Sequence, residues 1–311
     1  MLTRLFRRAS RGSAAPEPAN PAELLRRVRA IELRARRLVD ALFAGQYVAV
    51  FRGRGIDFYE LRAYVPGDDT RTIDWKTFAR RGEPFVRRYR EDRELTVIFA
   101  VDVSASMRSG NGRRPKADVA AELCAVLALA AARNGDRVGL LLFAESPERY
   151  IRPAAGQRHV LRVVRELLGA RPSSRGTDLA AALGHLQRVH RRRATVFLVS
   201  DFLGGSFARE LRAAADRHDL IAICVRSPLD TDLPAAGIVR LADAETGRVV
   251  EVDTRSAAVR AAYAEAVRRA DEERALLFGS LGIDEIAVTT EEDYVPALIR
   301  FFEQRQARVA S

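Results

Sequence analysis

From Glu94 onward the chain alternates between short apolar segments and longer amphipathic ones, and this alternation limits the possible folds more than any other feature. Short apolar strands separated by helices are typical of a parallel sheet with helices on both faces. The candidate strands are LTVIFAVD (95–102), RVGLLLFA (137–144), ATVFLVSD (194–201), LIAICVR (220–226) and IDEIAVTT (283–290). The candidate helices span 116–133, 157–169, 178–191, 205–218, 255–280 and 292–306. We therefore expect an α/β fold with a doubly wound, mainly parallel sheet over residues 94–311.

One stretch of this region has a different pattern. Residues 237–253, GIVRLADAETGRVVEVD, alternate apolar and polar side chains on both sides of Glu245, Thr246 and Gly247. Such alternation around a turn predicts a β-hairpin, here inserted into the α/β body.

The chain before residue 94 divides into a lead-in and a small module. Residues 1–20 are basic and rich in Pro, Gly, Ser and Ala, which indicates a flexible segment. Residues 21–93 begin with apolar side chains at helical spacing, namely Leu24, Val28, Ile31, Ala35, Leu38 and Leu42. This pattern predicts a helix packed on its own protein. A helix that binds a partner or a membrane surface is the alternative.

The rest of that module is predicted to be rich in β-structure. IDFYELRAYV (56–65) alternates as a strand does, PGDD (66–69) indicates a turn, and EPFVRRYRE (83–91) indicates a second strand. The turn region is dense in charge, and ion pairs around an apolar Trp75 would stabilise it. The alternative is a surface that contacts a partner. The residues of that surface would be Arg62, Asp68, Asp69, Arg71, Asp74 and Trp75.

Charge and cysteine content narrow the class of protein. The formal net charge is +11, but of 52 basic residues only Lys76 and Lys116 are lysines, so the excess is general arginine enrichment. Aromatic residues are not interleaved with the arginines, and a nucleic-acid ligand is therefore not favoured.

Cys124 and Cys224 have no metal or redox spacing and are predicted to be reduced core thiols. No segment has the length of a membrane span or the pattern of a signal peptide. We expect a cytoplasmic protein, with peripheral membrane contact left open.

Oxygen-bearing side chains follow several predicted strands. Asp102, Ser104 and Ser106 come just after one strand, Thr177 precedes a helix, and Asp201 ends another strand. In open α/β sheets, ligands bind beyond the carboxyl ends of the strands. Each residue also has a local interpretation, since Thr177 and Asp201 are suitable helix N-caps. Together, two carboxylates and three hydroxyls form a hard oxygen set that suits Mg²⁺ or Mn²⁺.

The pattern DVSAS (102–106), with Thr177 and Asp201, resembles the metal-ion-dependent adhesion site of von Willebrand factor type A domains. Asp102, Ser104 and Ser106 match its first motif, and Thr177 and Asp201 match its threonine and final aspartate. Asp201 stands in SDF, where many such domains have glycine after the aspartate. The resemblance implies a von Willebrand factor A-like sheet. It also implies a Mg²⁺-dependent recognition module whose coordination is completed by an acidic side chain of a partner.

The upstream segment PGDDTRTIDW (66–75), with VRRYRED (86–92), is similar to the bacterial family called domain of unknown function fifty-eight, over about residues 22–306. Members of that family occur with MoxR-type AAA+ ATPases, so the resemblance implies such an ATPase as partner and a client protein. Two departures are notable. Many members begin with membrane-spanning helices, which are not seen here, and Tyr47 and Ala49 replace an expected His and Ser.

A metal-dependent phosphoesterase is the alternative function, because a metal held by carboxylates can activate water. His159, His185, His190 and His218 all lie in predicted helices, away from the three strand ends, and no phosphate-binding loop with its lysine is present. We therefore expect a binding module rather than an enzyme.

Overall fold

The computed structural model describes residues 21–39, 50, 57–66, 68–90, 94–108, 114–171 and 173–310. The predicted lead-in at 1–20, together with Leu42, Tyr47 and Ala49, lies outside these residues.

A six-stranded sheet forms the centre of the molecule, with the strand order β10-β7-β6-β3-β4-β5. Its strands are β3 (Thr96–Asp102), β4 (Arg137–Phe143), β5 (Pro147–Ala154), β6 (Thr195–Ser200), β7 (Asp219–Arg226) and β10 (Asp284–Thr289). All neighbouring strands are parallel except β4 and β5, which are antiparallel. The prediction of a mainly parallel α/β sheet is confirmed.

Strand β5 was not predicted. It lies at the edge of the sheet, carries Pro147 and Pro153, and alternates polar side chains on its exposed face. Prolines are tolerated at edge strands because one row of amides there has no partner strand. The sequence of an edge strand therefore resembles that of a loop.

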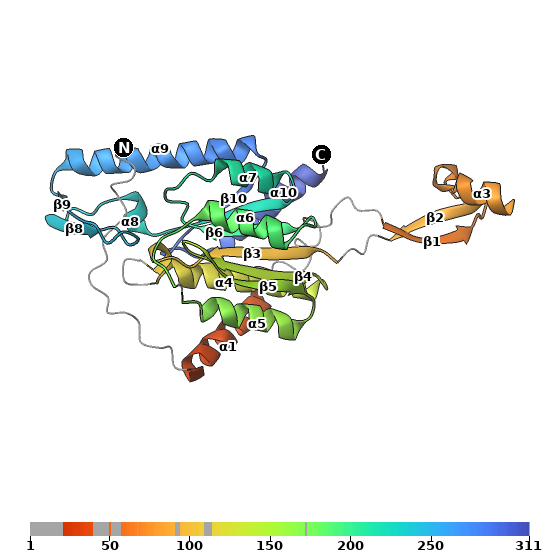
Figure 1. The fold of residues 1–311 in the computed structure, drawn as a ribbon, viewed down its shortest axis with the longest axis horizontal. Coiled ribbons are helices and arrows are strands. Elements are labelled where there is room, and N and C mark those ends of the chain that lie inside the picture. The colour runs from red at the N-terminus through yellow and green to blue at the C-terminus, as the bar shows by residue number, and fades with distance from the viewer. Residues whose placement is uncertain are drawn as a thin grey trace.

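Helices cover both faces of the sheet (Figure 1). They are α4 (Lys116–Arg133), α5 (Gln157–Leu168), α6 (Leu179–Val189), α7 (Ala208–Ala215), α9 (Ala257–Ser280) and α10 (Val295–Ala310), and the single-turn helix α8 (Pro228–Thr231) contacts α9. Successive residues of β3 alternate between the two faces. Phe99 and Val101 pack in one apolar core with α4, α5 and α10, while Ile98 and Ala100 pack in the other with α6 and α7. This double burial explains why the strand sequence is apolar throughout.

The N-terminal helix α1 (Pro21–Leu38) packs against α4 and α5, on the lower side of the sheet in Figure 1. Val28, Ile31 and Ala35 are buried, and Arg27 forms an ion pair of 2.6 Å with Asp118 of α4. The helix therefore packs on its own protein, as its apolar spacing predicts. With α1 on one side and the sheet on another, α4 is apolar nearly all round, and its Cys124 is a buried free thiol, as is Cys224 in β7.

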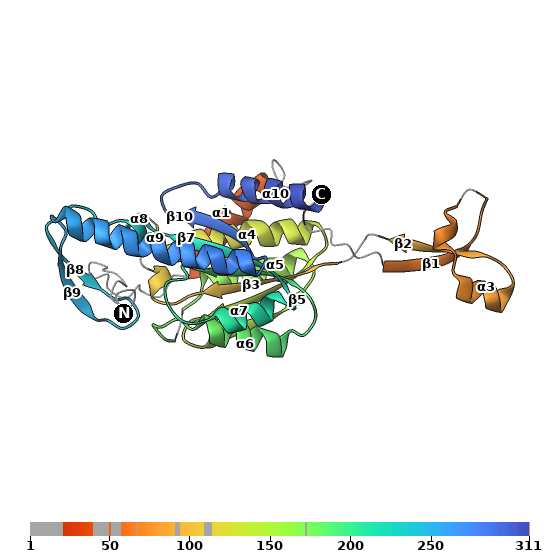
Figure 2. The same cartoon turned by 90° about the horizontal axis from the view of Figure 1, so that it is seen from above.

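A slender arm projects from the α/β body, as Figures 1 and 2 show. It consists of β1 (Asp57–Ala63), the 3₁₀ turn η2 (Thr70–Thr72), α3 (Trp75–Arg81) and β2 (Phe85–Arg90). Strands β1 and β2 pair antiparallel, as expected from their alternation. Helix α3 was not predicted.

The end of the arm adds a local role for Asp74 and corrects the interpretation of Trp75. Asp74 is an N-cap, because its Oδ1 accepts hydrogen bonds from the amides of Lys76 (3.0 Å) and Thr77 (3.2 Å), and Gly82 ends α3 at φ 75°. Trp75 is 64% exposed and contacts Phe78 edge to face, so the expectation that it anchors an apolar core was wrong.

For the other residues of this surface, the structure supports one predicted ion pair. Arg62 pairs with Asp68 at 2.6 Å, which supports the expectation of stabilising ion pairs, and Asp69 is exposed. The side chain of Arg71 is not described.

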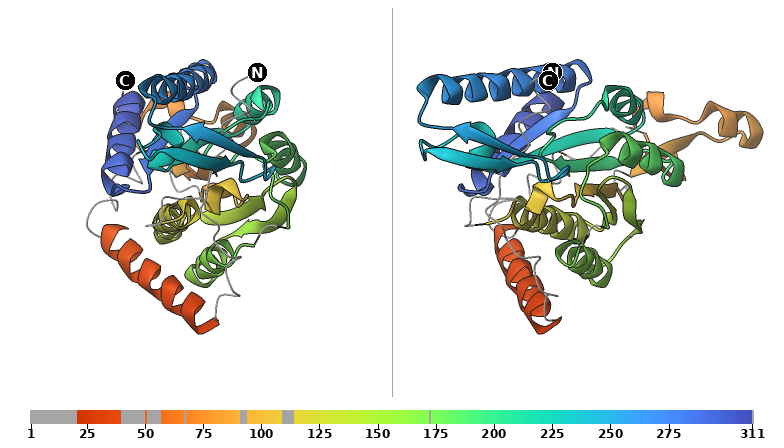
Figure 3. Two further views of the ribbon diagram at one scale, coloured as in Figure 1. Left: turned by 90° about the vertical axis from the view of Figure 1, so that its left-hand side faces the viewer. Right: turned by 60° about the vertical axis from the view of Figure 1, so that its left-hand side comes forward.

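The predicted inserted hairpin is present as β8 (Ile238–Ala242) and β9 (Val249–Asp253), paired antiparallel. Figure 3 shows this ribbon beyond the ends of the strands of the main sheet, beneath the long helix α9. Among the described residues, no helix has the length and apolar content needed to cross a bilayer.

Candidate metal centre

The sheet topology predicts a ligand-binding position at the carboxyl end of the central strand β3. This strand pairs with β4 on one side and with β6 on the other, and the chain leaves to one side after β3 and returns to the other at β6. In open α/β sheets, ligands bind at such a reversal, beyond the carboxyl ends of the strands. Asp102 is the last residue of β3, and Asp201 is the first after β6.

The loop after β3 folds back on Asp102. The Oδ1 of Asp102 accepts a hydrogen bond of 2.9 Å from the Ser104 amide, and the Oδ2 of Asp102 accepts one of 2.8 Å from the Ser200 hydroxyl. The Oγ atoms of Ser104 and Ser106 lie 3.1 Å apart. All four side chains are buried, so these oxygens form a fixed group rather than a solvated turn.

Asp201 is fixed by a cation from α4. The Nζ of Lys116 lies 2.6 Å from Asp201 Oδ2 and 3.2 Å from Asp230 Oδ2, and the Leu203 amide donates to Asp201 Oδ1 at 3.2 Å. Lys116 is only 1% exposed and is the first residue of α4, where the helix dipole disfavours a positive charge. Its position is therefore explained by the two aspartates and not by helix formation.

The turn after Asp201 is strained. Phe202 has φ 50°, in the left-handed region that favours glycine, and it packs edge to face on Phe278 with ring centres 5.4 Å apart. A bulky residue in this region is an outlier, and here its packing compensates for the backbone strain.

Thr177 approaches the site from a third loop. The Ala105 amide donates to the Arg175 carbonyl at 3.1 Å, which joins this loop to the one after β3. The Thr177 hydroxyl donates to Glu245 Oε1 at 2.8 Å, and Glu245 belongs to the turn between β8 and β9. Neither local alternative holds, because Asp178 is the N-cap of α6 and α7 begins at Ala208, well beyond Asp201.

The electrostatics of the centre favour an additional cation. Burial, and then the charge of Asp201, raise the pKa of Asp102 to about 6. Asp102, Asp201 and Asp230 are buried together with one ammonium, that of Lys116, so these four groups carry two excess negative charges when ionised. Bringing a divalent cation to them would neutralise that excess.

The donor set fits Mg²⁺ or Mn²⁺. Ligands at about 2.1 Å in an octahedral shell lie about 3 Å apart along an edge, which is close to the separation of the two serine hydroxyls. Among the described residues, no three His, Cys, Asp or Glu side chains form a metal-binding group. A cation here would therefore depend on the serine hydroxyls as well as on Asp102.

Several residues of the centre were missed in the sequence. They are Lys116, Ser200, Asp230 and Glu245. Lys116 had a usable signal, because it is one of two lysines in a chain that otherwise uses arginine. The others depend on tertiary placement.

The histidines make their contacts elsewhere. The His159 ring lies 2.8 Å from the Val138 carbonyl, His185 contacts Tyr150, and His190 lies beside His218. No imidazole is therefore placed as a general base beside the strand-end oxygens.

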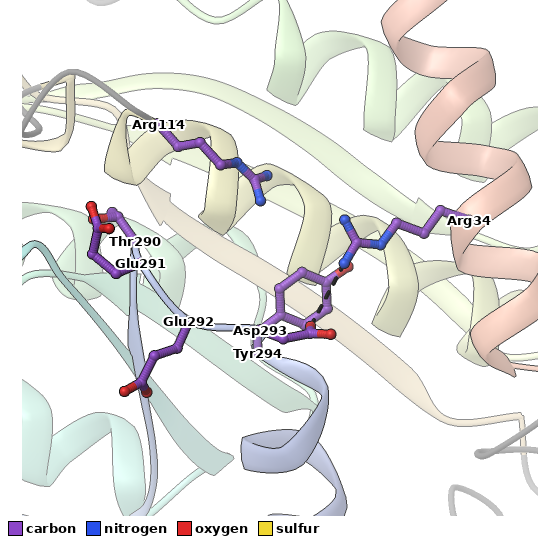
Figure 4. Close-up of a pocket in the computed structure, with 7 residues that line it drawn as sticks. All are labelled: Arg34, Arg114, Thr290, Glu291, Glu292, Asp293 and Tyr294. Carbon is purple, nitrogen blue, oxygen red and sulfur yellow. Dashed lines mark ion pairs between the residues drawn. The ribbon is translucent and has the colours of Figure 1, made fainter.

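A concave region lies between α1, α4 and the start of α10, and Figure 4 shows its side chains. Arg34 contacts Glu122 at 3.4 Å and Asp293 at 3.6 Å and lies over the Tyr294 ring, while Arg114 pairs with Glu122 at 2.6 Å. Arg34 thus joins α1 to the body, while Arg114 pairs within the body, and we interpret this cleft as a structural contact between α1 and the body.

Comparisons with known proteins point to one family. The model of the family described as "Protein of unknown function DUF58" matches residues 60–273. An uncharacterized protein of Mycobacterium tuberculosis is 34% identical over 310 residues, covering 94% of this chain and 96% of the relative. Another, of Mycobacterium avium, is 38% identical over 161 residues, covering 50% of this chain and 93% of that protein.

Comparison with solved structures gives matches of low sequence identity and low TM-score. The conserved hypothetical protein BatB from Bacteroides thetaiotaomicron is 16% identical, with 68% of this chain and 99% of that chain covered and a TM-score of 0.43. An aerotolerance-related membrane protein from Bacteroides fragilis is 17% identical, with 69% and 99% covered and a TM-score of 0.44.

Proposed function

This chain belongs to the DUF58 family of proteins of unknown function, and we propose that it is a divalent-cation-dependent protein–protein interaction module with a von Willebrand factor A-like site. The observation that carries the proposal is the group formed by Asp102, Ser104 and Ser106 beside Asp201, at the reversal point of the sheet. Asp102 and the two serine hydroxyls would hold Mg²⁺ or Mn²⁺, with Thr177 and Asp201 around them.

The bound cation would supply one open coordination position for an acidic side chain of a client protein. Mg²⁺ keeps several exchangeable waters in protein sites, and a carboxylate can replace one of them. The chain's own residues would orient the ion, since the Ser104 amide and the Ser200 hydroxyl fix both oxygens of Asp102. Because no imidazole lies beside the group, the proposal is recognition without catalysis.

A MoxR-type AAA+ ATPase is the proposed partner, on the strength of the family resemblance alone. The arm offers a surface for it, because Trp75 and Phe78 are exposed next to each other on α3. Exposed aromatic side chains of this kind are enriched at protein interfaces. Client selection at the metal centre and ATPase contact at the arm would then use separate parts of the chain.

Thermal unfolding with and without Mg²⁺ or Mn²⁺ tests the metal centre. Each tenfold excess of metal over its dissociation constant should add about 1.4 kcal/mol of stability, and Asp102→Ala should abolish this gain. Asp178→Ala is the matched control. It removes a neighbouring aspartate that only caps α6, so it should lower the melting temperature and keep the metal-dependent gain.

Two results would contradict the proposal. One is a melting temperature of the wild type that does not change at millimolar metal. The other is metal-dependent hydrolysis of a generic phosphoester that is lost in Asp102→Ala, which would favour the phosphoesterase.

A further inference from the structure

The hairpin β8–β9 brings a carboxylate to the candidate metal centre from within the chain. Glu245 Oε1 accepts a hydrogen bond of 2.8 Å from the hydroxyl of Thr177, one of the residues proposed to surround the cation. A hydroxyl that donates its proton still has two lone pairs, so this bond leaves the Thr177 oxygen able to face a cation. Glu245 and the cation would then share the same threonine.

The turn is built to hold Glu245 in this position. Asp243 Oδ1 accepts hydrogen bonds from the amides of Glu245 (2.9 Å) and Thr246 (3.2 Å), and the Asp243 carbonyl accepts one from Gly247 (2.8 Å). Gly247 has φ 72°, which its lack of a side chain permits. The backbone at Glu245 is thereby fixed, while Thr246, Gly247 and Arg248 are exposed.

The strands of the hairpin form a two-stranded sheet separate from the main one. Ile238 is 64% exposed and Val249 is 47% exposed. Isolated two-stranded hairpins are marginally stable in water. No residue of β8 or β9 is fully buried, whereas β3 and β6 are buried almost throughout, so the segment that carries Glu245 has less packing to lose on displacement than these central strands have.

We propose that Glu245 is a ligand of the cation at this centre and occupies the coordination position that an acidic client would take. The hairpin supplies an internal carboxylate in the resting protein, and an external carboxylate replaces it. This inference rests on the proposed function and adds the residue that completes the shell. It follows that binding of a client is coupled to release of the hairpin turn.

Titration calorimetry with Mn²⁺ alone tests the assignment. Glu245→Gln keeps the size and polarity of the side chain and removes its charge, and it should weaken Mn²⁺ binding roughly tenfold or more, the range seen when groups that support a metal are removed. Glu251→Gln is the matched control, because Glu251 lies on β9 of the same hairpin and only makes an exposed contact with Arg240. It should bind Mn²⁺ within about twofold of the wild type, in keeping with an exposed pair that contributes little.

Two further measurements report the contact itself. In the wild type, Mn²⁺ should slow hydrogen exchange of the amides at 243–248, and in Glu245→Gln it should not. Acetate at constant ionic strength should restore part of the Mn²⁺ affinity of Glu245→Gln, because a small carboxylate can enter the position that the glutamate has left.

The possible outcomes separate this inference from the proposed function. If Glu245→Gln binds Mn²⁺ as tightly as the wild type, or more tightly, while Asp102→Ala does not bind it, then Glu245 is not a ligand and the metal centre stands. If the wild type does not bind Mn²⁺, both fail.

Discussion

The ammonium of Lys116 lies 2.6 Å from the carboxylate of Asp201, and both side chains are at most 2% exposed. A buried ion pair of this kind is strongly destabilised when one partner is removed, because the other charge is left in a medium of low polarity. The Lys116 side chain therefore places a positive charge of the protein itself at the candidate metal centre. This cation pairs with both Asp201 and Asp230.

Lys116→Met tests this role. Loss of the ammonium should lower the free energy of unfolding by about 3–5 kcal/mol in EDTA, because it leaves two buried carboxylates without this partner. Mg²⁺ should stabilise the variant more than it stabilises the wild type. Lys76→Met is the control, since Lys76 is exposed on the arm, and it should change neither quantity. Equal gains from Mg²⁺ in Lys116→Met and wild type would show that the two cations act on separate groups.

Asp102→Asn should stabilise the metal-free protein. The pKa of Asp102 is raised to about 6 from 3.8, so the folded state binds this proton more tightly than the unfolded state, and stability falls as the pH rises through 6. At pH 7 the neutral side chain should raise the free energy of unfolding by up to about 3 kcal/mol. Denaturant unfolding in EDTA at pH 7 and pH 5 measures this. The gain should shrink at pH 5, and a loss of stability at pH 7 would contradict the prediction.

Gly139→Ala should destabilise the edge of the sheet. A Cβ at Gly139 in β4 would lie 2.8 Å from Pro153 Cγ and 3.1 Å from the Ile151 carbonyl oxygen of β5. Overpacking of this kind costs about 1–3 kcal/mol. Gly279→Ala is the control. A Cβ there, in helix α9, meets no atom within 4 Å, and the change should stabilise by about 0.5–1 kcal/mol.

His218 should make the fold sensitive to acid. Burial, and then the charges of His190, Arg217 and Arg193, lower the pKa of His218 from 6.5 to about 4, and neither ring nitrogen has a hydrogen-bond partner among the residues that the structure describes. The unfolded chain therefore binds this proton below pH 6.5, whereas the folded chain does not until about pH 4. Stability contributed by His218 is lost as the pH falls across that window. His218→Phe should lose less stability between pH 6.5 and pH 4.5, and equal slopes would exclude the effect.

Trp75→Ala separates partner contact from folding. Because Trp75 is 64% exposed, its removal should change the free energy of unfolding by less than about 0.5 kcal/mol. Phe197→Ala, in the buried centre of β6, should cost about 3–5 kcal/mol by comparison. If the arm contacts the ATPase, a pull-down with Trp75→Ala should recover less of it at unchanged stability. A large loss of stability would instead make Trp75 structural.

The sheet and its helices were predictable because strands such as Thr195–Ser200 are buried on both faces and so are apolar throughout. The hairpin at 238–253 was predictable from its alternation. The elements that were not predicted are those whose stability depends on their place in the fold rather than on a regular apolar pattern. The edge strand Pro147–Ala154 resembles a loop, and helix Trp75–Arg81 is short, with an N-cap and a C-terminal glycine as its only signals.

The candidate centre divides in the same way. Asp102, Ser104 and Ser106 follow one strand closely, so their proximity could be read from local sequence. Lys116 and Asp201 are 85 residues apart, and Thr177 and Glu245 are 68 residues apart, so both contacts depend on how the loops meet. Spacing along the chain carries no information about such pairs.

The near absence of lysine has a practical consequence for chemistry on this protein. Of its two lysines, Lys116 is buried in the interior and Lys76 is exposed on the arm. Acylation is a reaction of the unprotonated amine at an accessible surface. Of the two lysines, an amine-reactive fluorophore or cross-linker should therefore modify only that of α3 in the folded state, which lets the arm be labelled without any mutation. Modification of Lys116 would then serve as a direct signal of unfolding.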